Sequence, residues 1–276
     1  MHSDSRPIGV FDSGVGGLTV LSALRCELPD ESFVYLGDTA RLPYGTKSAA
    51  TVERYALQIA RMLVAQPVKA LVVACNTAAA AALPALHAEF ADLPLLGVIE
   101  PGADAAIAAT RSGHIAVLAT EATVRGGAYQ NVISQRRSDI RITAIACQLL
   151  VALAEEGWTD GPVARNAVER YLLPSFEAEP ASRPDTLVLG CTHFPMLRGV
   201  IADVVGPQVV IVDSAATTAK AMRAMLAATS LLRPPDPTGA PTIRLLATDG
   251  AARFASAGGR FLGQAVDAAD IEVIDI

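Results

Sequence analysis

The chain has 276 residues, 51% of them hydrophobic and 18% charged, and its formal net charge is -6. This length and apolar content suit one large α/β unit or two domains of ordinary size, and they exclude a disordered or fibrous protein. The acidic balance argues against nucleic-acid binding as the main activity, because proteins that bind a phosphate backbone carry a basic surplus.

Short apolar runs alternate with longer helix-like segments along the chain. Residues 1–7 are polar and lack the regions of a signal peptide, so we expect a cytoplasmic protein. Strands are predicted at residues 8–11, 33–36, 70–74, 95–98, 114–118, 140–146, 186–189, 209–212, 243–247 and 271–274. The runs are continuously apolar, which is typical of strands covered on both faces by helices. The pattern therefore predicts an α/β fold with mostly parallel sheets.

The loop DSGVGG at residues 12–17 follows the first predicted strand and precedes a helix expected to begin near Leu18. Its backbone N–H groups are placed to hold an anion, although a tight turn needs glycines for steric reasons alone. It matches neither G-x-x-x-x-G-K-[ST] nor G-x-G-x-x-G, the two nucleotide-phosphate signatures. A carboxylate at Asp12 beside such a turn indicates recognition of an ammonium group or orientation of a base.

A polar loop, GDTARLPYGT at residues 37–46, follows the second predicted strand. Ligand contacts concentrate in loops at the carboxyl edge of a parallel sheet. Tyr44 and the backbone around Gly45 are therefore candidate substrate contacts. Thr46 or Ser48 is the expected N-cap of the next helix.

Residues 70–88 carry no Asp, Glu, Lys or Arg and are long enough to span a membrane. The stretch nevertheless contains Asn76, Thr77 and Pro84 and is mostly alanine after the first residues. It divides more naturally into a buried strand, a polar turn and a helix. We therefore expect no membrane association.

The four cysteines have different surroundings. They are too few and too widely spaced for a disulfide scaffold, and no pair has the C-x-x-C spacing of a zinc site. Cys26 and Cys147 lie in apolar segments and are expected to be inert packing residues. Cys75 and Cys191 each follow a predicted strand and precede polar groups that expose a thiol and shift its pKa. Such thiols suit a redox pair, proton exchange with a carbon or metal ligation; the last is weakest, because His193 alone completes no ligand set.

Two parts of the chain share one pattern. LVVACNT at residues 71–77 and LVLGCTH at residues 187–193 both combine a buried strand, a small residue, a cysteine and polar residues. Upstream, residues 8–13 and 115–120 likewise end a strand in a polar turn. Chance likeness between βα units is the alternative explanation. Because ligands bind at the carboxyl ends of parallel strands, two related halves predict a cleft with one cysteine on each wall.

Turn-forming residues indicate where the chain passes between these halves. Prolines within residues 93–102 mark the crossing into the second half, and the Gly-Pro pair at residues 206–207 marks the region of return. The proline-rich stretch 233–241 is an expected surface loop. The predicted domains are residues 1–97 plus 211–276 for the first and residues 98–210 for the second.

A set of motifs, taken in order, resembles the cofactor-independent aspartate/glutamate racemase family over nearly the whole chain. The motifs are IGVFDSGVGGL at 8–18, GDT at 37–39, PYG at 43–45, ACNT at 74–77, TEATV at 120–124, EEG at 155–157, GCTHFP at 190–195 and VDS at 212–214. The resemblance implies two pseudosymmetric domains, each a mostly parallel sheet flanked by helices, with the active site in the cleft between them. It also implies interconversion of L- and D-glutamate, the D-form feeding peptidoglycan synthesis, and a homodimer.

Carried over position by position, the resemblance makes Cys75 and Cys191 the two acid/base thiols, Cys75 acting on D-glutamate and Cys191 on L-glutamate. Asp12 and His193 would assist them. The positions that match substrate-binding residues are Asp12, Ser13, Tyr44, Gly45, Asn76, Thr77, Thr120, Thr192 and His193. The resemblance implies no cofactor and no metal, and none of the lysines lies in a motif associated with pyridoxal phosphate.

Four positions depart from the residues usual in the family. Ala119 replaces a glycine, Gly126 replaces a serine, and Gln148 and Ala152 replace prolines in the stretch leading to Glu155. None of the four is a proposed catalytic group. The departures put in doubt only the loop geometry of this stretch and any regulatory or interface role there.

Three other functions stay open. An aspartate racemase of the same family is disfavoured by His193, because those enzymes usually carry a glutamate after the corresponding Cys-Thr. A non-catalytic amino-acid binding protein would have the same cleft without exchanging the α-proton of its ligand. A dithiol redox enzyme would form a reversible disulfide between Cys75 and Cys191.

Overall fold

Parallel strands form two separate sheets in this computed structural model, which describes residues 4–177, 179, 182–235 and 239–276. The strands are β1 (Ile8–Asp12), β2 (Phe33–Gly37), β3 (Ala70–Val73), β4 (Leu95–Gly97), β5 (His114–Ala119), β6 (Arg141–Ala146), β7 (Thr186–Gly190), β8 (Val210–Asp213), β9 (Ile243–Ala247) and β10 (Ile271–Val273). The first sheet has the order β10-β9-β2-β1-β3-β4 and the second β6-β5-β7-β8. The strands agree with the predicted apolar runs to within one residue at each end.

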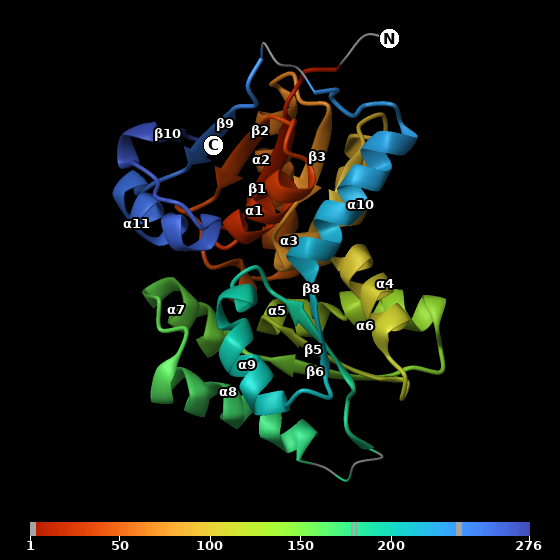
Figure 1. Cartoon of the computed structure of the whole chain (residues 1–276). Helices are drawn as coiled ribbons and strands as arrows, with labels where there is room; N and C mark the ends of the chain where they lie inside the picture. Colours follow the sequence, from red (N-terminus) through yellow and green to blue (C-terminus); the bar gives the residue numbers. More distant parts are fainter. Residues whose placement is uncertain (1–3, 178, 180–181, 236–238) are drawn as a thin grey trace.

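Helices cover both faces of each sheet, as continuously apolar strands require. They are α1 (Leu18–Glu27), α2 (Ala49–Val64), α3 (Asn76–Glu89), α4 (Ile99–Ala109), α5 (Glu121–Gly126), α6 (Ala128–Arg136), α7 (Gln148–Glu156), α8 (Gly161–Phe176), α9 (Arg198–Val205), α10 (Ser214–Ala228) and α11 (Ala251–Leu262). Around the first sheet α1 packs with α10 and α11, and α2 with α3; around the second, α8 packs with α7 and α9, and α4 with α6. Figure 1 shows the sheets in an upper and a lower half, which confirms the expected α/β fold class.

The second sheet repeats the plan of the first. The order β2-β1-β3-β4 in the first sheet corresponds to β6-β5-β7-β8 in the second. In this correspondence β3 leads to Cys75 and β7 leads directly to Cys191. The two cysteines therefore occupy equivalent places, as the sequence repeat predicts. The repeat is not complete in detail, since Cys75 caps the α-helix α3 whereas Cys191 precedes a short 3-10 helix, Phe194–Leu197.

The chain crosses between the halves twice. It passes from β4 into α4 near residue 98 and returns through β8 into α10, which packs on α1 and also contacts α4. Every strand of the first sheet falls within residues 1–97 or 211–276. β8 belongs to the second sheet and spans the predicted boundary between residues 210 and 211. The residue limits of the two domains stay a prediction.

Several local expectations have clear outcomes. Residues 70–88 form β3, a short turn and most of α3, and none of the helices in the described ranges is long and apolar enough to cross a membrane. Ser48 is the N-cap of α2, its hydroxyl accepting a hydrogen bond from the Thr51 amide. Within the expected loop 233–241 the described residues form neither helix nor strand, and residues 236–238 lie outside the described ranges.

The expectation that Cys26 is a packing residue is wrong. Its side chain is exposed near the end of α1. The helix buries Leu18, Leu21 and Leu24, and position 26 lies on a different face of a 3.6-residue repeat. Cys147, in contrast, is fully buried, as expected.

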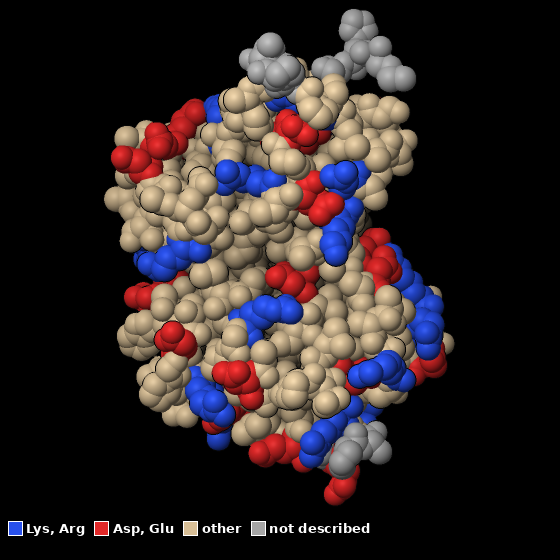
Figure 2. All heavy atoms as spheres, in the orientation of Figure 1, with Lys and Arg blue, Asp and Glu red and all other residues tan. Residues whose placement is uncertain are grey.

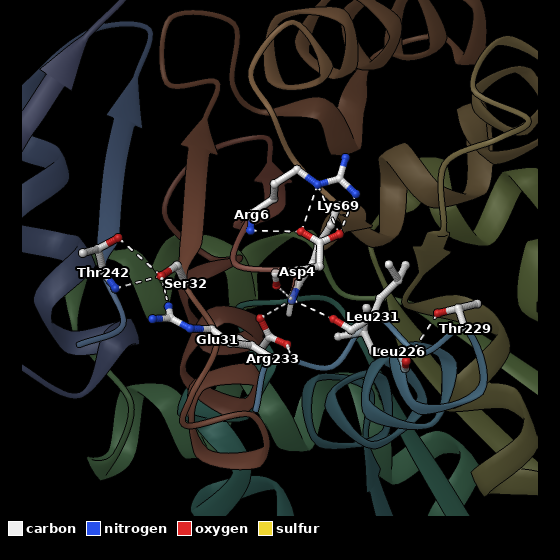
Figure 3. A network of polar contacts seen from close by, with 10 residues as sticks. All are labelled: Asp4, Arg6, Glu31, Ser32, Lys69, Leu226, Thr229, Leu231, Arg233 and Thr242. Carbon is white, nitrogen blue, oxygen red and sulfur yellow. Dashed lines mark hydrogen bonds and ion pairs between the residues drawn. The ribbon is translucent and has the colours of Figure 1, made fainter. Parts of the chain in front are cut away.

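A buried ion pair joins four segments at the amino-terminal end of the first sheet. The Lys69 ammonium lies 2.6 Å from Oε2 of Glu31, and both side chains are almost fully buried. Lys69 also donates hydrogen bonds of 2.8 Å to the carbonyl oxygens of Asp4 and Leu231. In Figure 3 the Lys69 ammonium, just before β3, contacts the N-terminal segment, the residue Glu31 just before β2 and the chain that follows α10. Because parallel strands begin here, this network lies away from the carboxyl edge where a ligand is expected.

Charged side chains are intermixed on the face shown in Figure 2. Lys and Arg (blue) and Asp and Glu (red) alternate over both halves of the molecule. Among the described residues on this face there is no extended basic surface to hold a phosphate backbone.

Candidate active site

One small pocket lies where strand ends of the two sheets meet. Ser13 follows β1, Cys75 follows β3, Thr120 follows β5 and Cys191 follows β7, and all four line the pocket. The other sequence-predicted residues that line it are Tyr44, Gly45, Asn76, Thr77, Thr192 and His193. Because each half contributes one cysteine, the pocket has a thiol on each of its two walls.

Asp12, the last residue of β1, is fully buried beside this pocket. Its Oδ2 atom accepts a 3.0 Å hydrogen bond from the amide of Gly14, so the glycine loop holds a carboxylate of its own chain. Oδ1 is buried and has no hydrogen-bond partner among the described residues. Burial raises the pKa of Asp12, and the charge of His193 and the loop amides oppose that rise.

The glycine loop also permits the two halves to approach closely. A Cβ atom at Gly16 would lie 2.4 Å from Cε1 of His193 and 2.5 Å from the Thr192 hydroxyl. Nearby, the Thr19 hydroxyl of α1 donates a 2.9 Å hydrogen bond to the Thr192 carbonyl. The loop therefore needs glycine at position 16, because any side chain there would clash with Thr192 and His193 of the second half.

Cys75 lies on the wall formed by the first half. It is the N-cap of α3, and its sulfur accepts a 3.4 Å hydrogen bond from the Ala78 amide and lies 3.6 Å from the Ser13 hydroxyl. Burial, followed by the negative charge of Asp12, raises the pKa of this thiol to about 12. Cys75 is therefore protonated at neutral pH.

Cys191 lies on the opposite wall beside a charged pair. Its sulfur is 3.7 Å from Nδ1 of His193, and Nε2 of the same ring is 3.1 Å from Oε1 of Glu155. Burial alone lowers the pKa of His193, but the hydrogen bonds to Cys191 and Glu155 and the nearby negative charges raise it to about 10. The bond to His193 lowers the pKa of Glu155. A positive charge therefore stands next to the Cys191 sulfur.

The two thiols thus have opposite electrostatic surroundings. The negative charge of Asp12 disfavours the thiolate of Cys75, whereas the His193 imidazolium, a positive charge, lies beside the Cys191 sulfur. The pocket accordingly has one thiol on each wall, and the two thiols have different charged neighbours. Across the described parts of the chain, no three His, Cys, Asp or Glu side chains are grouped closely enough to hold a metal ion.

Amide and hydroxyl groups form much of the remaining pocket wall. The Tyr129 hydroxyl donates a 2.8 Å hydrogen bond to Oδ1 of Asn76, and the buried Nδ2 of Asn76 has no partner within the described residues. The hydroxyl oxygens of Thr77 and Thr120 lie 2.9 Å apart across the two halves. The hydroxyl oxygen of Thr123 lies 3.0 Å from that of Thr120. The first amides of α3 lack intrahelical acceptors, and they add a partial positive charge at this point. These donors suit a carboxylate.

Tyr44 lines the pocket, but its hydroxyl is directed to another partner. The hydroxyl donates a hydrogen bond to Asp38, which also accepts hydrogen bonds from Arg41 at 2.7 Å and Thr248 at 2.9 Å. Burial and then the charge of Asp38 raise the pKa of Tyr44, so the phenol stays neutral. Tyr44 therefore offers its ring and backbone to the pocket.

The pocket wall includes residues that the sequence reasoning did not select as site residues: Gly14, Leu42, Pro43, Gln148, Val151 and Glu155. Glu155 matters most, because it holds the His193 ring. Its signal in the sequence was the EEG motif at residues 155–157, which supported the family resemblance without a role for the carboxylate. Gln148 is one of the four positions that depart from the family pattern.

The pocket is closed in this conformation. It encloses about 30 Å³, room for one or two water molecules. A larger hollow of about 470 Å³ lies between α11 and the end of α7, and Leu42 and Glu155 line both spaces. Arg260 of α11 donates a hydrogen bond to the Glu155 carbonyl, and Arg253 lies 3.7 Å from its carboxylate. Binding of an amino acid therefore requires this pocket to widen.

The chain is similar to known racemases over its full extent. Residues 19–222 match the Asp/Glu/hydantoin racemase family model. A glutamate racemase of Geobacter metallireducens is 49% identical over 258 residues, which cover 94% of this chain and 93% of that protein. The crystal structure of a glutamate racemase isoform from Bacillus anthracis matches with a TM-score of 0.90 at 36% identity, covering 99% of this chain and 98% of the other. A Francisella tularensis glutamate racemase in complex with D-glutamate matches with a TM-score of 0.88 at 34% identity, covering 98% of each chain. This chain belongs to the Asp/Glu/hydantoin racemase family.

Proposed function

We propose that this protein interconverts L-glutamate and D-glutamate by proton transfer at Cα between two thiols. The observation that carries the proposal is the position of Cys75 and Cys191 on two walls of one pocket, each after a strand of a different sheet. The names of the most similar relatives support glutamate as the substrate.

The reaction removes the proton from one face of Cα and adds a proton to the other. From L-glutamate, the Cys191 thiolate takes the Cα proton and becomes a thiol, while the Cys75 thiol delivers its proton to the opposite face and becomes a thiolate. From D-glutamate the roles are exchanged. Each direction needs one thiolate and one thiol, so the resting protonation pattern selects the enantiomer that reacts.

The surroundings of the two thiols support Cys191 as the resting base. The His193 imidazolium lies beside the Cys191 sulfur, and Glu155 holds the ring in place. The pKa of the Cys75 thiol, raised to about 12, keeps the proton that must be delivered to the other face. This arrangement fits Cys75 as the proton donor and Cys191 as the proton acceptor in the reaction of L-glutamate.

The substrate must be held while charge develops at Cα, without an electron sink such as pyridoxal phosphate. Preorganised donors stabilise such charge on the α-carboxylate. The unpartnered Nδ2 of Asn76, the Thr77 and Thr192 hydroxyls and the amides that begin α3 supply these donors. The Ser13 hydroxyl in the pocket wall and the buried Asp12 carboxylate beside it are the acceptors that we expect for the substrate ammonium.

Further expectations follow from glutamate racemisation. The D-glutamate formed would enter peptidoglycan synthesis, and the protein would act in the cytoplasm, where thiols stay reduced. The family resemblance also supports a homodimer. Leu149, Trp158 and Val163 on and between α7 and α8 are large apolar side chains more than half exposed, which fits a surface that a second copy covers. Light scattering of the purified protein measures this assembly.

Exchange of the α-proton with D2O, measured by NMR without added cofactor, tests the proposed function. A racemase replaces the α-proton of L-glutamate with deuterium and forms the D-enantiomer, whereas a binding protein leaves the α-proton in place. Faster exchange on L-aspartate than on L-glutamate would identify an aspartate racemase. Activity that depends on a Cys75–Cys191 disulfide would identify a redox enzyme.

A further inference from the structure

The side chain of Gln148 carries an unsatisfied polar atom in the wall of the active-site pocket. Gln148 is the first residue of α7, and the pocket lining includes it together with Cys75 and Cys191. Its Oε1 atom is buried and has no hydrogen-bond partner among the described residues. Leaving a buried polar atom unpaired costs free energy, so this end of the amide is available to bond to a ligand in the pocket.

The amide lies at the contact between the two halves. A Cβ atom added at Gly45 would lie 2.9 Å from Oε1 of Gln148 and 2.9 Å from Cβ of Thr120. Gly45 and Thr120 both line the pocket, and the Thr120 hydroxyl is 2.9 Å from that of Thr77. The Gln148 amide therefore borders the same polar wall that offers hydroxyl donors.

Two other buried polar atoms beside the pocket lack partners within the described parts of the chain: Oδ1 of Asp12 and Nδ2 of Asn76. An amino acid with two carboxylates brings one ammonium group and two acceptors of equal charge. In the proposed function Asp12 accepts from the ammonium, and because both ring nitrogens of His193 already contact Cys191 and Glu155, amide and hydroxyl donors remain for the two carboxylates. A half-turn about the last side-chain bond of Gln148 exchanges its oxygen for its NH2 group, so the amide supplies such a donor at the same place.

We propose that the Gln148 carboxamide donates a hydrogen bond to a carboxylate of the bound glutamate, an inference that rests on the proposed function. The contact would be an addition made by this chain, since proline is the usual family residue at this position and has no side-chain polar group. The inference adds a substrate-binding residue and assigns it no part in proton transfer.

The position of Gln148 in its helix allows a clean test. Cys147 is the N-cap of α7, so Gln148 occupies the first helical position, where proline is tolerated because its missing N–H has no intrahelical acceptor. Gln148→Pro and Gln148→Met both remove the amide. Proline suits the backbone at the first helical position, and methionine has a side chain of similar length. Gln148→Glu keeps the shape and replaces the donor by a negative charge. Gln264→Met, on an exposed amide bonded to Arg25 outside the pocket, is the matched control.

Steady-state kinetics with L-glutamate distinguish the outcomes. We expect Gln148→Met and Gln148→Pro to raise KM about tenfold with kcat little changed, because the lost bond is to a charged group in ground and transition state alike. Gln148→Glu should raise KM further, because its carboxylate repels that of the substrate, and Gln264→Met should behave as the wild type. Circular dichroism verifies that each variant is folded.

Three results overturn the inference. They are an unchanged KM in both Gln148→Met and Gln148→Pro, a fall in kcat without a change in KM, and a wild-type KM in Gln148→Glu, which would place the ammonium at this amide. If the wild-type protein does not racemise glutamate, the proposed function fails; if it does and the variants match it, only the role of Gln148 fails.

Discussion

The Nε2 atom of His193 lies 3.1 Å from Oε1 of Glu155, a residue 38 positions earlier in the chain. This contact gives the Cys191 wall a charged pair, whereas Cys75 faces the buried carboxylate of Asp12. The two halves repeat one strand order, yet their thiols are not electrostatically equivalent. In the proposed mechanism this difference gives the two thiols different roles.

Glu155 should control the alkaline limit of activity. The pKa of His193, raised to about 10, means that the imidazolium beside Cys191 persists at neutral pH and is lost as the pH rises through that value. Glu155→Gln removes one cause of the raised pKa, so we expect the alkaline fall of kcat/KM for L-glutamate to move to lower pH. Activity near neutral pH should fall about tenfold. A pH profile of Glu155→Gln measures both effects.

The neighbouring exposed residue offers the control for that profile. Glu156→Gln removes an adjacent charge that has no contact with His193 among the described residues and should leave the alkaline limb in place. An unshifted limb in Glu155→Gln, or an equal shift in both variants, would refute the role given to Glu155.

Alkylation rates should separate the two thiols. Iodoacetamide reacts with thiolates, and at about pH 7.5 the Cys75 thiol, with its pKa raised to about 12, stays protonated. We expect Cys191 to be modified before Cys75 in a Cys26→Ser background, which removes the exposed thiol. Mass spectrometry of the digested protein gives the order of labelling. Faster labelling of Cys75 would contradict the assignment of Cys191 as the resting base.

The buried pair Lys69–Glu31 should stabilise the fold without contributing to catalysis. Lys69→Met leaves a buried carboxylate without its cation, and we expect a loss of about 3–5 kcal/mol in the free energy of unfolding. Lys220→Met, at an exposed position on α10, should change stability little. Urea denaturation of both variants measures the difference.

A double variant tests the origin of that cost. Lys69→Met combined with Glu31→Leu removes both charges, so it should be more stable than Lys69→Met alone. A double variant as unstable as the single one would show that packing, and not the unpaired carboxylate, causes the loss.

The carboxylate of Asp185 should make stability depend on acid. It precedes β7 and accepts hydrogen bonds from the Thr110 hydroxyl at 2.6 Å and from the amides of Arg111 at 2.7 Å and Ser112 at 2.6 Å. Burial opposes ionisation, but these bonds lower the pKa to about 2. Because the unfolded-state pKa is higher, about 3.9, the stabilisation is complete above that value and is lost as the pH falls toward 2.

Asp185→Asn should therefore cost about 1 kcal/mol at neutral pH, a value reduced because the carboxylate is partly exposed, and less near pH 3. Urea unfolding at the two pH values measures the change, with Asp203→Asn on the exposed side of α9 as control. An equal cost at both pH values would contradict the linkage.

The strands and the repeated cysteine sites were predictable because each depends on local pattern. Continuous apolar runs mark buried parallel strands. The similar segments 71–77 and 187–193 begin at equivalent positions of the two sheets, since Leu71 pairs with Gly9 and Leu187 with Ala116. Grouping at the carboxyl edge follows from parallel strand direction alone. Parallel strand direction in both halves likewise predicts the single pocket that residues of both halves line.

Contacts that depend on how distant segments pack were beyond the sequence pattern. The approach of Glu155 to His193 depends on the packing of α7, and the Tyr44 hydroxyl turns to Asp38 because both are buried together. Cys26 lies between Arg25 and Glu27 on the outer face of its helix, which the presence of a lone cysteine does not reveal. Helical phase and long-range packing decide these three cases.

Deuterium incorporation at Cα, measured together with inversion on Cys75→Ser and Cys191→Ser, tests the two-thiol account most directly. The wild-type protein should exchange the α-proton of L-glutamate in D2O without added cofactor and form D-glutamate. Each serine variant should remain folded and show severely reduced racemisation, because one face of Cα then lacks its proton donor or acceptor. Full turnover in either variant would contradict the account.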